Sequence, residues 1–275
     1  MGAAPLIGGP GGARPGGQAA AQQERLTELG QRLARFSRGL VFTGAGVSTE
    51  SGLPDFRSPT GLWSRYDPSL FEFRRFLTDP EARRALWRFR LELLSQRPRP
   101  NPAHLAIARL EELGLVRWVV TQNIDGLHQA AGSRRVVELH GSNRWVECVS
   151  CGNVIPTEDA LARVRVGEQD PLCLRCGGFL KLTAVSFGQP LPAGALEAAR
   201  LAARECDFCL VVGSTLSVYP AAGVPDEARR SGAYVVVLND EPSPLDHLAD
   251  GVLRSRAGKI LPALVREVEA ALPAA

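Results

Sequence analysis

The chain has 275 residues, 45% of them hydrophobic, so it can bury a substantial core in one large domain or in one domain with a small module. Its 32 lysines and arginines nearly balance its 29 aspartates and glutamates, which argues against nucleic acid or an anionic membrane as the main partner. No stretch approaches the roughly 20 apolar residues of a spanning helix, and no basic segment followed by an apolar one opens the chain. We therefore expect a cytoplasmic protein.

Residues 1–23 are mostly Gly, Ala and Pro, with too little large apolar surface to offset the entropy lost on ordering. We expect this segment to be a flexible, disordered tail without chemistry. From Glu24 the apolar residues recur at helical spacing, which predicts a helix before the first strand. The residues that carry this spacing are Leu26, Leu29, Leu33 and Phe36.

Four short apolar runs predict buried parallel strands, at residues 40–43, 115–120, 208–212 and 234–238. Helical patterns lie between them, at 81–95, 102–113, 193–204 and 222–231. This alternation predicts an α/β fold with a doubly wound, Rossmann-like parallel sheet, whose ligand site lies at the carboxyl ends of the strands. Polar or glycine-rich turns follow the strands and should converge on one crevice, at residues 43–46, 121–125, 213–215 and 239–241.

The turn after the first strand is rich in small residues, because residues 44–48 read GAGVS. Small residues let backbone N–H groups approach a phosphate, as in nucleotide pyrophosphate sites. Thr49 stands where the common dinucleotide fingerprint has its third glycine, which disfavours an ordinary hydride-transferring dehydrogenase. The loop continues to Asp55, Phe56 and Arg57, a carboxylate, an aromatic face and a guanidinium that could hold a nicotinamide.

Six cysteines form three Cys-x-x-Cys pairs, which are Cys148/Cys151, Cys173/Cys176 and Cys206/Cys209. Glycine follows each of the first two pairs, and 21 residues separate them, as in a zinc ribbon with four cysteine ligands. Disulfides or a redox pair are the alternatives. A disulfide is disfavoured in a cytoplasmic protein, and a redox pair would normally lie at the start of a helix. We expect residues 143–181 to form an inserted module around one structural zinc ion. The third pair enters an apolar strand without a following glycine, which predicts buried small hydrophobic residues.

One of the four histidines has the position expected of a general base. His140 ends the apolar run 136–139, just before Gly141 and the predicted zinc module, where two domains would form a cleft. The other three have simpler interpretations. His104 opens a helix and should be structural, His128 could merely pack, and His247 lies in a late polar turn.

Together these segments resemble the sirtuin family, of the bacterial type with a four-cysteine zinc module. The resemblance runs in order and spacing from about residue 24 to 270, through segments 44–57, 121–128, 138–141, 187–188, 213–215 and 239–242 and the two zinc pairs. It implies an NAD-dependent protein lysine deacylase, or deacetylase. The acyl oxygen would attack C1′ of the nicotinamide ribose, nicotinamide would leave, and the acyl group would end on ADP-ribose. His140 would be the general base, acting through a ribose hydroxyl.

The resemblance also implies the other site residues. Asn123 would join His140 as a catalytic residue, and the acyl-lysine of a protein substrate would lie in an apolar tunnel with Val185, Phe187 and Gly188. The NAD-binding domain would comprise residues 24–142 and 182–275. The residues that bind the cofactor NAD would be Gly44, Ala45, Gly46, Ser48, Asp55, Phe56, Arg57, Trp63, Gln122, Asn123, Ile124, Asp125, Gly213, Ser214, Thr215, Asn239, Asp240, Glu241 and Ala257.

The sequence departs from the family pattern at the substrate groove. Gln189 stands where glutamate is common and Ser186 where a bulky aromatic often stands, which affects peptide preference and tunnel width. One branch of the family recognises acidic acyl groups with a tyrosine and an arginine, and this chain has Arg88 and Leu91 at those positions. An enzyme specific for succinyl or malonyl groups is therefore disfavoured, although Arg88 and Arg90 leave that specificity open.

Two other functions remain as alternatives. The first is a protein mono-ADP-ribosyltransferase, which the presence of His140 disfavours. The second is a non-catalytic zinc-ribbon protein that senses a nucleotide or binds nucleic acid, which the balanced charge disfavours.

Overall fold

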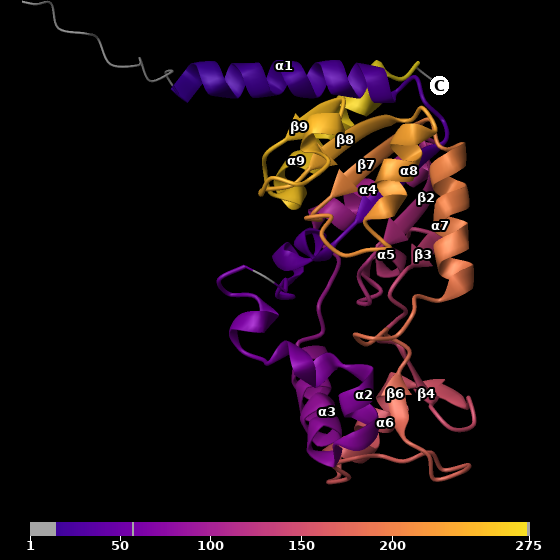
Figure 1. The fold of residues 1–275 in the computed structure, drawn as a ribbon. Coiled ribbons are helices and arrows are strands. Elements are labelled where there is room, and N and C mark those ends of the chain that lie inside the picture. Colours follow the sequence, from indigo (N-terminus) through magenta and orange to yellow (C-terminus); the bar gives the residue numbers. More distant parts are fainter. Residues whose placement is uncertain (1–14, 57, 274–275) are drawn as a thin grey trace, which may run out of the picture.

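The computed structural model describes residues 15–56 and 58–273. Its larger part is built on a six-stranded parallel sheet of order β3-β2-β1-β7-β8-β9 (Figure 1). The strands are β1 (Gly39–Thr43), β2 (Val116–Thr121), β3 (Val136–Glu138), β7 (Phe208–Val212), β8 (Tyr234–Leu238) and β9 (Gly251–Leu253). β1 pairs in parallel with both β2 and β7, so the strand order reverses there. Ligands of such sheets bind at the carboxyl ends of the strands beside this switch point.

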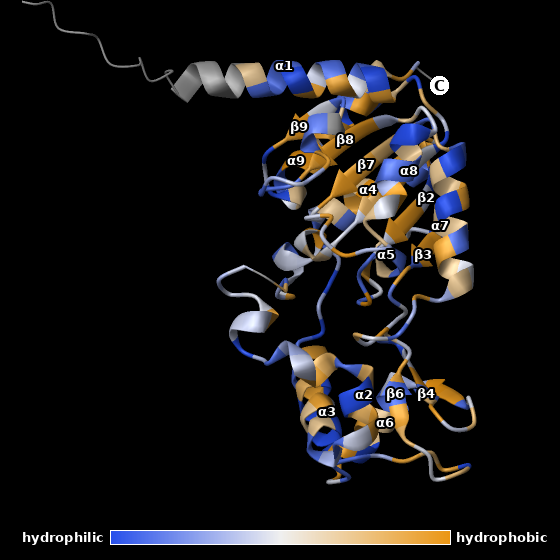
Figure 2. Cartoon of the chain, in the orientation of Figure 1, coloured by the Kyte–Doolittle hydropathy of each residue, from blue (hydrophilic) through white to orange (hydrophobic). Residues whose placement is uncertain are grey.

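Helices cover both faces of this sheet. The buried residues of α1, α4 and α9 form one apolar cluster with one face, and those of α7 and α8 form a second cluster with the other. Figure 2 shows the strands as a continuous apolar layer between these helices. The helices are α1 (Pro15–Leu33), α4 (Pro102–Glu112), α5 (Leu127–Ala130), α7 (Ala193–Glu205), α8 (Gly223–Arg230) and α9 (Ala257–Ala271). The predicted doubly wound α/β fold is confirmed.

The first helix is longer than the sequence pattern predicted. Leu26, Leu29 and Leu33 are buried as their spacing indicated, but α1 begins at Pro15, inside the segment expected to be a flexible tail. Residues 15–23, which belong to that segment, are helical in the structure, and residues 1–14 lie outside the described part of the chain. Residues 18–23 are alanines and glutamines, which favour helix, so the packed turns extend toward the N-terminus.

A smaller lobe lies below the carboxyl edge of the sheet in Figure 1. It contains an antiparallel sheet of order β5-β4-β6, with β4 (Trp145–Cys148), β5 (Val154–Pro156) and β6 (Leu180–Leu182), and the helices α2 (Phe73–Thr78), α3 (Pro80–Ser95) and α6 (Thr157–Arg165). Trp87 of α3 is fully buried in one apolar cluster with Val146, Leu161 and Leu180. The lobe therefore combines two separate stretches of chain, and α3 belongs to its core.

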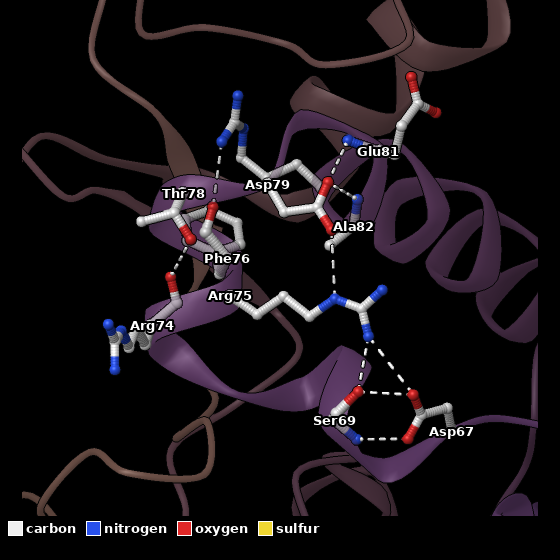
Figure 3. A network of polar contacts seen from close by, with 10 residues as sticks. Asp67, Ser69, Arg74, Arg75, Phe76, Thr78, Asp79, Glu81 and Ala82 are labelled. Carbon is white, nitrogen blue, oxygen red and sulfur yellow. Dashed lines mark hydrogen bonds and ion pairs between the residues drawn. The ribbon is translucent and has the colours of Figure 1, made fainter.

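A network of polar contacts at the junction of α2 and α3 fixes the angle between these two helices (Figure 3). The Asp79 carboxylate caps α3 by accepting from the backbone N–H groups of Glu81 and Ala82, at 2.9 and 3.1 Å. Arg75 of α2 donates to the same carboxylate at 3.2 Å and to the Ser69 hydroxyl at 2.6 Å.

Within the described ranges, no helix is both long and apolar enough to cross a membrane.

Candidate functional site

Two glycine-rich turns pack against each other at the switch point of the sheet. Gly213 follows β7 with a φ of +61°, and a Cβ atom there would lie 2.3 Å from the Val47 nitrogen, which only glycine allows. Gly46 donates its N–H to the Gly213 carbonyl at 2.9 Å, and Gly44 donates to the Val212 carbonyl at 3.0 Å. The sequence predicted that the Gly46 N–H would approach a phosphate. In the structure this N–H already donates a hydrogen bond to the Gly213 carbonyl.

Gln122 connects this turn region to the predicted general base. It follows β2, and its side-chain amide donates to the Ser214 hydroxyl at 2.7 Å. Its backbone N–H donates to the Thr43 carbonyl at 2.9 Å, and its own carbonyl lies 2.7 Å from Nδ1 of His140. The ends of β1, β2 and β7 are thereby joined to the segment after β3, and three of the four predicted turns form a connected set of groups.

The surroundings of His140 favour a neutral imidazole with a free base nitrogen. A carbonyl oxygen can only accept, so Nδ1 carries the proton in its contact with Gln122, and Nε2 keeps its lone pair. Burial lowers the pKa of His140 from its ordinary value, and the bond to Gln122 offsets part of this. The His140 carbonyl accepts from the N–H of Val185 at 2.8 Å, so the backbone of His140 pairs with a residue that was expected in the substrate tunnel.

Asn123, Ser48 and Asp125 form a second connected group next to His140. The Asn123 amide donates to the Ser48 hydroxyl at 3.1 Å and to the Gly44 carbonyl at 3.2 Å. The Ser48 hydroxyl donates to the Asp125 carboxylate at 2.8 Å, and the other oxygen of that carboxylate accepts from the Leu127 N–H at 2.9 Å. A carboxylate and an amide are thus held in fixed orientations beside the glycine turn, suited to hydroxyl and carboxamide groups.

The aromatic side chains of Phe56, Trp63 and Phe187 form a wall. Trp63 lies 5.3 Å from Phe56 and 5.9 Å from Phe187, measured between ring centroids, and Phe56 and Phe187 are 41% and 48% exposed. Phe187 exchanges backbone hydrogen bonds with Phe71 and Phe73, and Gly188 follows it with a φ of +85°. This wall brings Phe56, which was expected to bind NAD, together with Phe187, which was expected in the substrate groove.

Three further residues that were expected to bind NAD are Asp55, Ile124 and Thr215. Asp55 accepts from the Ser58 N–H at 2.9 Å and so holds its own loop. Ile124 accepts from the Asn143 N–H at 2.9 Å at the entrance to the small lobe, and the Thr215 hydroxyl contacts Ser217 at 3.0 Å. Arg57 lies outside the described residues.

Asn239, Asp240 and Ala257, which were also expected to bind NAD, form a separate group. The Asn239 amide donates to the Glu241 carbonyl at 2.8 Å, within its own turn, and Asp240 is exposed. Ala257 is buried at the start of α9, where the next residue donates its N–H to the Glu50 carboxylate at 2.6 Å. No hydrogen bond within the described ranges joins this group directly to Asn123 or His140.

The four predicted metal ligands converge in the small lobe. The sulfur atoms of Cys148, Cys151, Cys173 and Cys176 all lie within 4.8 Å of one another. Two of the separations are 3.5 and 3.8 Å, and four sulfurs arranged tetrahedrally about 2.3 Å from zinc would be about 3.8 Å apart. The cluster is therefore consistent with a structural zinc ion.

The third cysteine pair lies elsewhere. Cys206 and Cys209 are buried in the apolar cluster under α7 and α8, and burial raises the pKa of the Cys206 thiol to about 12. The prediction that they are small hydrophobic residues is confirmed.

Sequence reasoning missed Asn101. Its amide donates to the Val47 carbonyl at 2.8 Å and to the Ser51 hydroxyl at 3.0 Å, so the start of α4 holds the glycine-rich loop in place. An asparagine before Pro102 is a good signal for a helix start. It contains no information about a loop about 50 residues earlier in the chain.

Comparison with known proteins gives a consistent result. A family model described as the Sir2 family matches residues 44–220. The chain is 41% identical over 240 residues to an NAD-dependent protein deacetylase of Thermodesulfovibrio yellowstonii, covering 86% of this chain and 93% of that protein. It is 48% identical over 238 residues to NAD-dependent protein deacylase 2 of Pyrobaculum aerophilum, with the same coverage. A solved Sir2 structure with a p53 peptide and NAD+ superposes with a TM-score of 0.79 at 36% identity, covering 87% of this chain and 97% of that one.

Proposed function

Because the chain belongs to the Sir2 family of NAD-dependent protein deacetylases and deacylases, we propose that the groups around His140 remove acyl groups from protein lysines. The acyl group is transferred to ADP-ribose, and nicotinamide is released. NAD is consumed as a substrate in this reaction. The observation that carries the proposal is the contact of 2.7 Å between His140 Nδ1 and the Gln122 carbonyl, because it leaves Nε2 free to accept a proton.

The chemistry divides into two steps. In the first, the acyl oxygen of the substrate bonds to C1′ of the nicotinamide ribose as the bond to nicotinamide breaks. In the second, His140 accepts a proton through the ribose hydroxyls, and the 2′ oxygen bonds to the acyl carbon. The C–N bond then breaks and the lysine amine leaves with a proton. Water adds to the acyl carbon, and the bond from this carbon to the 1′ oxygen breaks, which leaves the acyl ester on the 2′ oxygen of ADP-ribose. The lowered pKa of His140 supports its role, because the imidazole is neutral at pH 7.

Asn123 and Asp125 would bind the nicotinamide and ribose in the first step. The support is their fixed orientation on Ser48 and the glycine turn, which reduces the ordering required when NAD binds. Phe56, 41% exposed and next to Trp63, would cover the ribose and keep water from the reacting carbon. Arg57 would contact a phosphate or the ribose.

An acetylated segment of a protein is the proposed partner. The solved relative with a p53 peptide and NAD+ supports this, as does the wall around Phe187 next to Val185. The acyl-lysine would enter beside His140, with the peptide bound as an added strand. A cytoplasmic location suits the four cysteine thiols of the zinc cluster, which a reducing compartment keeps unpaired.

The test uses the full chain, an acetyl-lysine peptide and NAD, with peptide mass and free nicotinamide as readouts. We expect NAD-dependent loss of the acetyl group from the peptide. His140→Ala should reduce the rate at least about 100-fold, the usual contribution of a general base. His247→Ala, an exposed histidine on the short 3-10 helix Asp246–Leu248, is the matched control and should keep the rate. Nicotinamide release with ADP-ribose attached to protein, and no deacetylation, would favour the transferase alternative.

A further inference from the structure

We propose that His104 is a positioning residue for NAD binding, acting through Ser48 on Asp125. This rests on the proposed function and deepens it, because it identifies what orients the predicted nicotinamide-binding carboxylate. His104 is completely buried in the first turn of α4, and Ser48, 2% exposed, lies in the glycine-rich loop. The two residues are 56 positions apart, and Nε2 of His104 lies 3.4 Å from the Ser48 hydroxyl.

The cap of α4 determines which nitrogen of His104 carries the proton. Asn101 donates its backbone N–H to Nδ1 of His104 at 3.3 Å, as the reciprocal half of a capping box. Nδ1 is therefore the acceptor, and in a neutral imidazole the hydrogen must be on Nε2. Burial lowers the pKa of His104 to about 4, so the neutral form is the one present at pH 7. His104 consequently faces Ser48 as a donor.

This donor fixes the direction of the Ser48 hydroxyl. A hydroxyl has two acceptor positions and one hydrogen. The Asn123 amide, 3.1 Å away, and His104 donate to the two acceptor positions, so the single hydrogen is directed to the Asp125 carboxylate 2.8 Å away. Removing the His104 donor frees an acceptor position and lets the hydroxyl rotate away from Asp125. The Asp125 carboxylate would then lose one of the two hydrogen bonds that hold it.

A neighbouring histidine supports the other half of the site in the same way. The His104 and His128 rings are 4.9 Å apart, and Nε2 of His128 contacts the Thr43 hydroxyl at 2.9 Å. The Thr43 hydroxyl donates to that of Thr121 at 2.8 Å, and the Thr121 oxygen accepts the backbone N–H of Asn123 at 3.0 Å. Two buried imidazoles thus lie behind the two residues proposed to bind nicotinamide and ribose.

The test measures NAD affinity by calorimetry and KM for NAD by deacetylation, in four proteins besides the wild type. His104→Leu removes both hydrogen bonds. His104→Gln can accept from Asn101 with its oxygen and donate to Ser48 with its nitrogen, and is the conservative rescue. Ser48→Ala and the double variant His104→Leu/Ser48→Ala complete a cycle. Thermal unfolding of each protein reports the contribution of the helix cap separately.

We expect His104→Leu to weaken NAD binding about tenfold, which corresponds to one hydrogen bond to a charged group, with a smaller effect on kcat. His104→Gln should recover most of this loss. In the Ser48→Ala background, His104→Leu should add less than about twofold, because the acceptor of its bond is already absent. Independent tenfold effects of the two substitutions would overturn the proposal, as would a His104→Leu protein that unfolds earlier but binds NAD normally. A wild type that binds NAD without deacetylating peptide would instead refute the proposed function. The calorimetric NAD affinities of the variants would still test the role of His104.

Discussion

The buried pair His104 and His128 makes the protein sensitive to mild acid. Burial lowers the pKa of His104 to about 4 and that of His128 to about 3, while an unfolded histidine titrates near 6.5. Because the folded values are lower, the unfolded state binds more protons below pH 6.5, and stability falls as the pH falls through this region. Both folded values lie below 5, so the loss between pH 7 and pH 5 depends only on the unfolded value.

That loss is about 2 kcal/mol per histidine, or about 4 kcal/mol for the pair. Urea unfolding of wild type, His104→Gln and His128→Gln at pH 7 and pH 5 measures it. Acid also weakens zinc binding, so each variant is compared with the wild type over the same interval. Each glutamine variant should lose about 2 kcal/mol less than the wild type between the two pH values. His247→Gln removes an exposed histidine and should behave as the wild type. Equal losses in all four proteins would refute the reasoning.

Three other predictions follow from single contacts. Gly213→Ala should destabilise the protein by more than about 2 kcal/mol and abolish NAD binding in calorimetry, because the new Cβ atom would overlap Val47. Gly232→Ala is the control, since Gly232 also has a positive φ but a Cβ atom there would meet no atom within 4 Å. It should lower the stability by only about 1 kcal/mol. Elemental analysis should find one zinc ion per chain, absent in Cys173→Ser and retained in Cys206→Ser. The acid limb of kcat/KM should lie below pH 6.5, because burial lowers the pKa of His140; a midpoint above 7 would contradict its assignment.

The positions of the central strands and of the turns that follow them could be predicted from the sequence because both depend on local patterns. β1 and β7 are five-residue apolar runs, buried at every position, and small or polar residues end each of them. In a parallel sheet those ends lie on one edge, so the turns that contain Gln122 and Ser214 were expected to converge, and they do. His140 was expected on other grounds, at a cleft between two domains, and it contacts the Gln122 carbonyl. The spacing of the cysteine pairs was equally informative, since four thiols at that spacing favour one metal ion.

The rest depended on packing between segments far apart in the chain. The apolar face of α3 indicates that the helix is buried, but not that Trp87 packs against Val146 and Leu180, which lie more than 50 residues later in the chain. His104 was expected to be structural, and it does belong to the cap of α4, but its contact with Ser48 exists only because α4 lies beneath the glycine loop. Gly46 shows the same limit. Its N–H looked available in the motif, and Gly213, from another strand end, accepts it.

The stoichiometry of a single incubation tests the proposed chemistry most directly. Acetyl-lysine peptide, NAD and the full chain are combined, and mass spectrometry follows the peptide, nicotinamide and the ADP-ribose product together. Each acetyl group lost should be matched by one nicotinamide and one O-acetyl-ADP-ribose, and His140→Ala should form no O-acetyl-ADP-ribose at a significant rate and should not release nicotinamide over repeated turnovers. Deacetylation that yields free acetate without NAD consumption, or nicotinamide release that leaves the peptide acetylated and the protein ADP-ribosylated, would contradict the role assigned to His140 and the site around it.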